Sequence, residues 1–370
     1  MKRRNEEIWC GVVLPDDVVV EILSRLHPKS FFRSKCVSKT WLALSSHAFR
    51  LNKHLQPTLM GFFYGSSDKS RPIGFANITG RVNAVDATLS LSALPHQDYI
   101  AILDCCNGLL LIVCWDFGRG VGVQRVSSSH YSYMYVYNPA IRKYIAVELI
   151  PEDMEHFATY TFSLAFDPQE HSRFHVVCFA HSYHEGEYIN AFFTFSSDSG
   201  RWQQGGNMGC DLQITKSAKG TFLDGRVHRV TKRHEIVSVN PVDNSYLVTE
   251  FDFPALSAKG FSEIMQSEGR LHFMFLNSFQ NMSIWVSENG NRQKWIFKHQ
   301  ISLHEVKFIG GASWHWNLKL HPEKDALIVH CKNGRIILID LKTNESIEIF
   351  VLPNPKTYPK FWFYKPCYLV

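Results

Sequence analysis

The feature that most constrains this chain of 370 residues is a polar turn that recurs between apolar segments. In each copy an alternating strand leads into the turn, and an aromatic or β-branched residue opens the next strand. The copies are YVYNPAIRKY (135–144), FTFSSDSGRW (193–202), VSVNPVDNSY (237–246), IWVSENGNRQKW (284–295) and ILIDLKTNES (337–346). Their turns lie 58, 44, 47 and 53 positions apart. Such degenerate repetition is typical of a β-propeller, whose blades are four-stranded sheets.

A second recurring element, a glycine-centred turn before an apolar strand, supports the same architecture. It occurs in CNGLLLIV (106–113), FLDGRVHRV (222–230), SEGRLHFMF (267–275) and CKNGRIILI (331–339). At roughly 45 residues a blade, the 314 residues from 57 to 370 predict six or seven blades. A pair of β-sandwiches is the alternative, because short strands with regular turns also suit that fold.

The N-terminal part of the chain has helical periodicity instead. One face of a helix within residues 18–26 is predicted from the i, i+3, i+4 and i+7 spacing of Val19, Ile22, Leu23 and Leu26. Pro15 suits the first position of that helix, and Pro28 ends it.

Two further short helices are predicted to follow. Ser30 is the expected cap of the second, and the third is expected to begin near Ser38 with Val37, Trp41 and Leu44 as apolar anchors. We therefore predict an all-α domain of three helices at 13–56, preceded by a tail of residues 1–12 and followed by the all-β domain at 57–370.

Three short helices cannot bury all their apolar side chains against one another, because a unit of this size has too little interior. Some of these side chains must face another domain or another protein. Periodicity alone leaves both possibilities open.

The helical stretch resembles the F-box. The matching elements are Leu-Pro at 14–15, an acidic pair, Glu21-Ile22-Leu23, Arg25-Leu26, Phe32, Val37-Ser38-Lys39 and Trp41. His27-Pro28 departs from the family, which usually has Pro directly after the Leu. The resemblance implies that the helices dock on a Skp-type adaptor, which connects to a cullin and a ubiquitin-conjugating enzyme. The residues that it implies as adaptor contacts, or as supports for them, are Leu14, Pro15, Ile22, Leu23, Leu26, Phe31, Phe32, Val37 and Trp41.

The β region resembles the F-box-associated and kelch-like domains that follow plant F-boxes. CNGLLL, LAFDPQEHSRFHVV (164–177), KGTFLDGRVHRV and IWVSENG carry this resemblance, whereas the paired glycines of a strict kelch repeat are missing. In such proteins this domain captures the protein that is to be ubiquitinated.

The charge of the chain is concentrated in its first part. Residues 1–55 hold ten Lys/Arg and five Asp/Glu, which leaves 29 of each kind in the remaining chain. A neutral β region does not predict a nucleic-acid partner. The N-terminus has no signal-peptide pattern, and the longest apolar run, 109–115, is too short to span a membrane. We therefore expect an intracellular protein, in the nucleus or the cytoplasm, with reduced cysteines.

Three clusters suggest chemistry, and none predicts a cofactor, metal or catalytic site. The stretch from His181 to Glu187 and the stretch 152–156 lack an ordered third metal ligand and are expected to be exposed loops. Gly118-Arg-Gly-Val-Gly122 is not followed by a helix that could bind phosphate.

The sequence thus predicts a non-catalytic substrate-recognition subunit of an SCF-type ubiquitin ligase. The first alternative is a scaffold that binds the adaptor without promoting degradation. The second is a β-propeller enzyme with a helical prefix, which would need a buried ionisable cluster in the central channel, and no such cluster can be constructed from the sequence.

Overall fold

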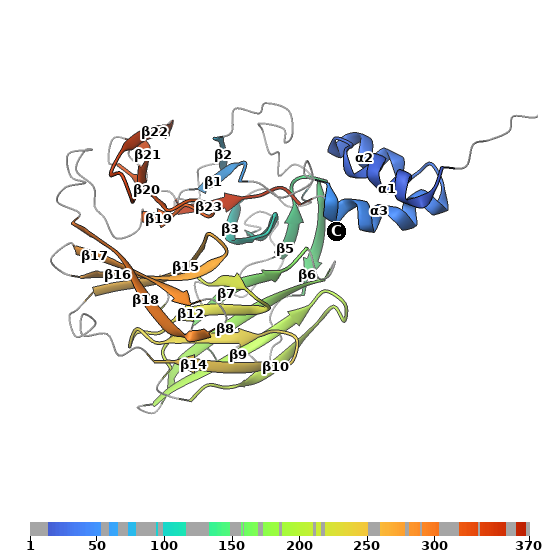
Figure 1. Cartoon of the computed structure of the whole chain (residues 1–370). Helices are drawn as coiled ribbons and strands as arrows, with labels where there is room; N and C mark the ends of the chain where they lie inside the picture. The colour runs from blue at the N-terminus through green and yellow to red at the C-terminus, as the bar shows by residue number, and fades with distance from the viewer. Residues whose placement is uncertain are drawn as a thin grey trace, which may run out of the picture. The chain divides into compact units, whose positions relative to one another are not determined.

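The computed structural model divides the chain into two compact units, residues 1–58 and 59–370 (Figure 1). The residues that it describes are 14–52, 59–65, 73–78, 94, 99–115, 133–148, 157, 159–168, 173–184, 187–209, 212–215, 219–250, 260–277, 281–288, 291–302, 318–331, 334–352 and 360–367.

The first unit consists of three helices, as the sequence predicts. They are α1 (Asp16–Ser24), α2 (Pro28–Ser34) and α3 (Lys39–Leu51). The N-cap of α3 is Ser38, whose Oγ accepts a hydrogen bond from the Trp41 N–H at 3.1 Å. The prediction of Ser30 as the cap of the second helix is wrong. Pro28 opens α2 itself, because its fixed φ suits a first helical position, and Ser30 lies inside the helix.

The second unit contains six antiparallel sheets in the part of the chain that the structure describes. In their spatial order the strands of the first two sheets are β2 (Gly74–Asn77), β1 (Gly61–Gly65) and β23 (Lys360–Tyr364), and then β3 (Tyr99–Cys106), β4 (Leu109–Trp115), β5 (Tyr133–Asn138) and β6 (Lys143–Val147). Those of the next two are β10 (Arg201–Asn207), β9 (Glu187–Ser196), β8 (Phe174–His184) and β7 (Thr159–Phe166), and then β11 (Thr221–Leu223), β12 (Arg226–Val230), β13 (Ile236–Asn240) and β14 (Ser245–Thr249). The last two sheets contain β15 (Gly260–Ser267), β16 (Arg270–Asn277), β17 (Asn281–Glu288) and β18 (Asn291–Ser302), and then β19 (Leu318–Leu320), β20 (Ala326–His330), β21 (Arg335–Asp340) and β22 (Ser346–Val351).

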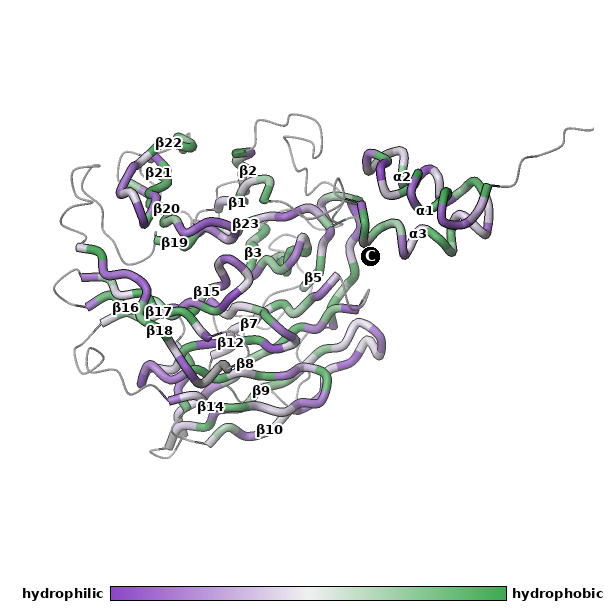
Figure 2. The backbone as a smooth tube through the Cα atoms, in the orientation of Figure 1, coloured by the Kyte–Doolittle hydropathy of each residue, from purple (hydrophilic) through white to green (hydrophobic). Residues whose placement is uncertain are grey.

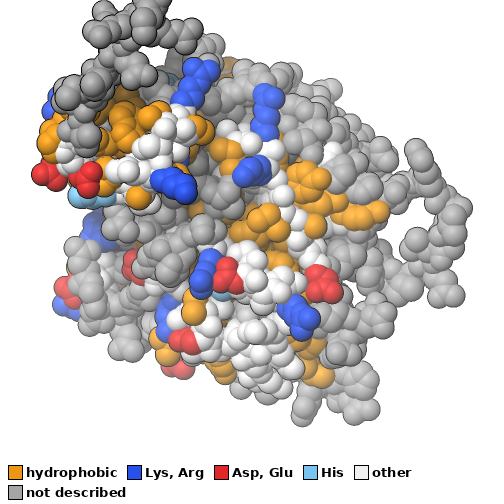
Figure 3. Space-filling model, turned by 90° about the vertical axis from the view of Figure 1, so that its right-hand side faces the viewer, with side chains coloured by type: hydrophobic (Ala, Val, Ile, Leu, Met, Phe, Trp, Pro, Cys, Tyr) orange, Lys and Arg blue, Asp and Glu red, His pale blue; other side chains and the backbone are white. Residues whose placement is uncertain are grey.

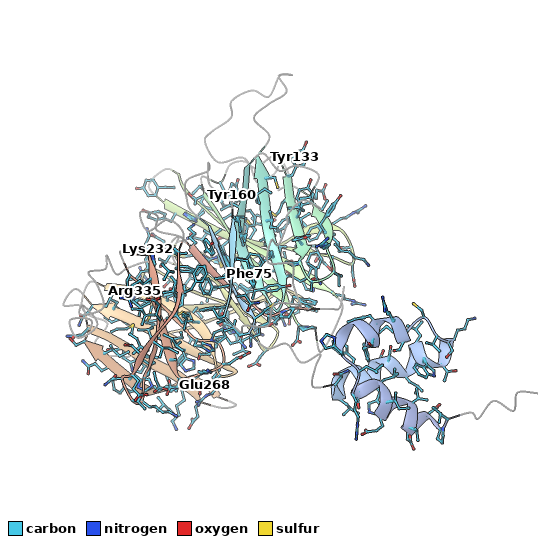
Figure 4. The ribbon with its side chains drawn as sticks, turned by 90° about the horizontal axis from the view of Figure 1, so that it is seen from above. Phe75, Tyr133, Tyr160, Lys232, Glu268 and Arg335 are labelled. Atoms are coloured by element: carbon cyan, nitrogen blue, oxygen red, sulfur yellow. The ribbon has the colours of Figure 1, made fainter. Side chains whose placement is uncertain are left out.

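These sheets are the blades of a six-bladed β-propeller. Figure 4 labels one residue on each sheet or on a turn within it: Phe75, Tyr133, Tyr160, Lys232, Glu268 and Arg335. Each sheet shares a buried apolar cluster with the next one, so that six clusters follow one another around the ring. The predicted fold class is confirmed with six blades, and the alternative of two β-sandwiches is wrong.

Pairing between the two ends of the β unit closes the ring. The last strand, β23, is antiparallel to β1, with Phe62 opposite Phe363. Phe62 and Ala76 of this sheet pack with Ile328 and Ile336 of the preceding blade. The strands nearest the end of the chain therefore complete a blade that its first strands begin.

The five polar turns occupy equivalent positions. All of them connect the third and fourth strands of a blade, from β5–β6 to β21–β22. Three of the four glycine-centred turns connect the first and second strands. There a residue with positive φ, such as Asn107 at 45°, precedes the glycine. The fourth, at Gly334, connects the second and third strands instead.

The sequence pattern of the blades follows from their burial. The middle strands are apolar on both faces, because each sheet is covered by neighbours on both sides. Leu109 to Cys114 in β4 and Ala326 to His330 in β20 are buried throughout. The fourth strands β6, β14 and β22 are largely exposed. Figure 2 shows apolar and polar residues distributed along these ribbons.

One of the predicted loops is instead part of a hairpin. His181 and Glu187 belong to β8 and β9, where His181 pairs with Asn190. The rings of Tyr183 and Tyr188 lie 4.8 Å apart across the two strands and extend the pairing to the end of the hairpin. The stretches 152–156 and 118–122 lie outside the described residues.

Candidate functional site

Helix α1 has apolar side chains on two sides, and only one side is buried. Val19 and Leu23 lie in the interior, and Leu23 has no exposed surface. Leu14, Val18 and Ile22 follow each other at intervals of four residues, on an adjacent side that is exposed. The predicted single stripe is therefore corrected: Val19 and Leu23 form the core of the helical unit, and Ile22, with 38% of its surface exposed, faces outward.

The nine residues that the family resemblance implied divide in the same way. Leu23 and Phe31 are fully buried, whereas Leu26, Phe32 and Trp41 are half-buried. The exposed members are Leu14, Pro15, Ile22 and Val37, of which Val37 is 63% exposed. Sequence reasoning missed Val18, Leu42 and Leu51, which are also exposed and apolar. Their signal was the apolar residue one position outside the expected stripe.

A small set of contacts fixes the geometry of this unit. Asn52, at the end of α3, is buried and donates from Nδ2 to the Leu23 carbonyl at 3.1 Å and to the Leu26 carbonyl at 2.7 Å. It thereby satisfies two carbonyls at the C-terminal end of α1, which the helix itself leaves without donors. The Phe31 ring lies 5.5 Å from that of Phe32 and 6.0 Å from that of Phe49. The unit can therefore present its outward apolar side chains on a fixed backbone.

Exposed apolar side chains also occur in patches elsewhere on the molecule. The space-filling view shows such side chains together with Lys and Arg on one face (Figure 3). In the β unit they lie mainly on fourth strands, such as Leu247 on β14 and Phe297 on β18. Scattered exposed residues of this kind are usual on soluble proteins. The stripe of α1 differs because its members repeat on one side of one helix.

The central channel of the propeller holds a second candidate site. A cavity of about 160 Å³ there is lined by residues of the innermost strands β3, β7, β11, β15, β19 and β23 and the turns next to them. Asp104, Lys219, Glu263, Lys319 and Lys365 are its charged lining residues in the part of the chain that the structure describes.

Sequence reasoning did not find this cluster. Its signal was a charged residue in or just before the first strand of a blade, ahead of a glycine-centred turn, as at Asp104, Lys219 and Glu263. These residues lie far apart in the sequence, and only the ring brings them together.

Both carboxylates of the channel are engaged. Asp104 Oδ2 accepts a hydrogen bond from the Leu164 N–H and Oδ1 accepts one from the Cys105 N–H, each at 2.8 Å. Glu263 forms an ion pair with Lys319. Burial raises the pKa of Asp104, although the two backbone hydrogen bonds favour its ionised form. No histidine lies among the described lining residues, so the two carboxylates and a histidine that an enzyme reading would require are not brought together there.

The cations of the channel are affected by burial as well. Burial lowers the pKa of Arg229, which lies on β12 behind the cavity, to about 10. Burial also lowers the pKa of Lys219, and the nearby charge of Lys319 acts in the same direction. The Nζ of Lys219 donates to the Phe361 carbonyl at 2.7 Å and lies 4.1 Å from the centroid of the Trp362 ring.

Other site types were also sought. Across the described ranges, no group of three or more His, Cys, Asp or Glu side chains is placed to bind a metal ion. Among the described helices, none is long and apolar enough to cross a membrane.

Comparison with known proteins identifies both units. Residues 13–49 match the F-box domain family, and residues 121–357, more than half of the chain, match the family described as F-box associated beta propeller domain.

Among curated proteins, the F-box protein At5g07610 of Arabidopsis thaliana is 30% identical over 210 residues, which are 51% of this chain and 44% of that protein. This match thus spans less than half the length of the relative. The putative F-box protein At5g52610 of the same plant is 24% identical over 92% of this chain and 93% of its own length. F-box only protein 8, again from Arabidopsis thaliana, is 42% identical over 53 residues, which are 14% of this chain. The chain therefore belongs to the F-box proteins in which an F-box-associated β-propeller domain follows the F-box.

Proposed function

We propose that this protein is the substrate-recognition subunit of an SCF-type ubiquitin ligase. The F-box, predicted at 13–56, would bind a Skp-type adaptor and through it a cullin, and the propeller, predicted at 57–370, would bind the protein to be ubiquitinated. The observation that carries the proposal is the outward apolar side of α1, in a domain that matches the F-box family.

The energetics of this surface favour a protein partner. Leu14, Val18 and Ile22 are about 40% exposed, whereas Leu23 beside them is fully buried. Complete burial of one such side chain stabilises a complex by roughly 1.5–3 kcal/mol, and burial of the part that is still exposed by a fraction of this. Three side chains on a fixed helix contribute without a large loss of conformational entropy, because the backbone is already ordered.

Charge would assist the encounter. Residues 1–55 carry an excess of five positive charges. Skp-type adaptors resemble one another in being acidic, so opposite charges would raise the association rate at low ionic strength. We place the complex inside the cell, in the nucleus or the cytoplasm.

In this role the chain would contribute proximity and no catalytic residue, cofactor or metal. Holding a target near a charged ubiquitin-conjugating enzyme converts an encounter of free molecules into a tethered reaction. The channel agrees with this role, since Asp104 and Glu263 are held by hydrogen bonds and an ion pair.

The first test is the affinity for a purified Skp-type adaptor. We expect Val18→Asp combined with Ile22→Asp to weaken binding by at least about a hundredfold, because two carboxylates would have to be desolvated in the interface. Both side chains are exposed, so the helical unit should still fold. Leu23→Asp is unsuitable, because Leu23 is in the core.

Val242→Asp provides the matched control, since Val242 is an exposed apolar residue in the turn after β13. Binding measured by biolayer interferometry should be unchanged in this variant. Equal affinity of the α1 double variant and the original chain would show that the docking surface is assigned wrongly. Ubiquitination of captured partners in a reconstituted complex then separates a ligase subunit from an adaptor-binding scaffold.

A further inference from the structure

We propose that the cavity in the central channel is a binding site for a single carboxylate group, with Lys219 as its counter-charge. This site lies in the propeller and does not depend on the F-box or on its adaptor. The carboxylate could belong to a small organic acid or to an acidic side chain of a bound protein, and the experiment below distinguishes these sources.

Lys219 differs from the other lysines that line the cavity. Lys319 forms an ion pair with Glu263, and the Nζ of Lys365 lies 3.1 Å from Glu323 Oε1. The Nζ of Lys219 has a carbonyl and an aromatic ring as its close contacts. Within the described ranges, no carboxylate oxygen lies within ion-pair distance of it.

A buried ammonium group without a counter-ion is destabilised, because the desolvation cost is not offset by an ion pair. One carbonyl and one ring face compensate only part of that cost. The lowered pKa of Lys219 agrees with this description. A bound anion would stabilise the charged form of the amine, and binding would then be accompanied by proton uptake.

The chemistry of the lining favours a monoanion. Asp104 and Glu263 lie on the same cavity wall and would repel a second negative charge, as in a phosphate dianion. The cavity, at about 160 Å³, has room for roughly five water molecules and thus for a small acid of that size.

The lining also offers apolar surface and a further donor. Phe222 and Trp362 line the same cavity and suit the hydrocarbon part of a carboxylic acid. Trp362 is buried, and its indole N–H has no acceptor among the described residues. A carboxylate with a short apolar stem therefore fits the lining better than a bare inorganic anion does.

Fluorine NMR of the full chain labelled with 5-fluorotryptophan tests the proposal. The chain has nine tryptophans, and Trp362→Phe assigns the resonance of Trp362. The probes are butyrate, its neutral analogue butyramide, and N-acetyl-glutamate N-methylamide. A ligand of six heavy atoms is expected to bind with a Kd of about 10 mM or tighter.

We expect butyrate, but not butyramide, to shift the Trp362 resonance. Lys219→Met, which has a similar shape and no charge, should weaken this response at least about tenfold. The exposed control Lys342→Met should leave it unchanged. Unaltered positions of the other tryptophan resonances show that a variant is folded. The butyramide comparison uses the original chain and needs no variant.

The outcomes separate clearly. A shift with the capped glutamate shows that a protein side chain can supply the carboxylate, whereas a shift with butyrate alone assigns the site to small acids. Equal responses to butyrate and butyramide, an unchanged response in Lys219→Met, or no response to any acid at about 50 mM would overturn the proposal.

Discussion

His330 shows how single buried polar residues affect this propeller. It ends β20, only 2% of its surface is exposed, and its ring meets that of Phe361 at 5.7 Å between centroids. Neither ring nitrogen has a hydrogen-bond partner within the described residues. Burial lowers the pKa of His330 to about 4, and the same direction and value apply to His272 and His321. These imidazoles are therefore neutral at physiological pH.

Substituting His330 by Leu should stabilise the propeller. At pH 7 the variant removes two buried polar atoms, for a gain of about 1–3 kcal/mol. Below pH 6.5 an unfolded chain binds a proton that the folded imidazole does not bind, so stability falls as the pH decreases from 6.5 towards 4. At pH 5 this linkage costs the original chain about 2 kcal/mol for each such histidine.

Urea unfolding at pH 7 and pH 5 checks this prediction. The difference between His330→Leu and the original chain should be larger at pH 5. His299→Leu is the control, because His299 Nε2 lies 3.0 Å from Asp325 Oδ1 and its loss removes a real contact. A His330→Leu variant that is less stable than the original chain at both pH values contradicts the account.

At the scale of elements, Asn52 connects two helices that would be marginal alone. Helix α1 has nine residues and α2 has seven, and helices this short depend on tertiary contacts. The two hydrogen bonds from Asn52 Nδ2 hold the C-terminal end of α1 against the end of α3. They also fix the turn of helix that carries Ile22.

Asn52→Ala should therefore loosen α1 within the full chain. It leaves two carbonyls without their side-chain donor, at a cost of about 1–3 kcal/mol. Hydrogen exchange measured by mass spectrometry should show faster exchange in peptides of α1 and no change in the blades. Ser46→Ala, at an exposed position of α3, is the control. Unchanged protection of α1 in Asn52→Ala would mean that packing alone holds the helix.

At the scale of the whole molecule, stability depends on ring closure. Each blade buries its faces only against its neighbours, so an open ring exposes two apolar faces at once. The closing contacts join β1 and β23, which lie about 300 residues apart in the chain. Gly108 approaches the segment after β23 closely. Its φ is +91°, and a Cβ there would lie 2.6 Å from the Lys365 carbonyl oxygen.

Deleting residues 360–370 should destabilise all six blades together. The deletion removes β23 and uncovers Phe62 and Phe63, each of which is 1% exposed. We expect a loss of several kcal/mol and a broad transition in urea unfolding followed by tryptophan fluorescence. A synthetic peptide of residues 360–370 should partly restore the midpoint.

Deleting residues 1–58 serves as the control for this experiment. Because β1 begins at Gly61, this deletion keeps every strand of the ring, and the unfolding midpoint of the β unit should be retained. An unchanged midpoint after removal of 360–370 would show that closure does not hold the blades together.

The sequence by itself determined which segments are helices, which are strands, and that the strands form repeated blades. These features are local, because periodicity, capping and turn chemistry act over a few residues. The polar turn between the third and fourth strands was predicted correctly in all five copies for this reason.

Tertiary structure decided the features that depend on distant partners. It set the number of blades, and it chose Leu23 for the core and Ile22 for the surface, since a helix with two apolar sides can be buried on either. It also brought Asp104, Lys219 and Glu263 into one channel. The physical reason is that burial and charge proximity depend on how the ring closes, and closure joins segments whose separation no local pattern records.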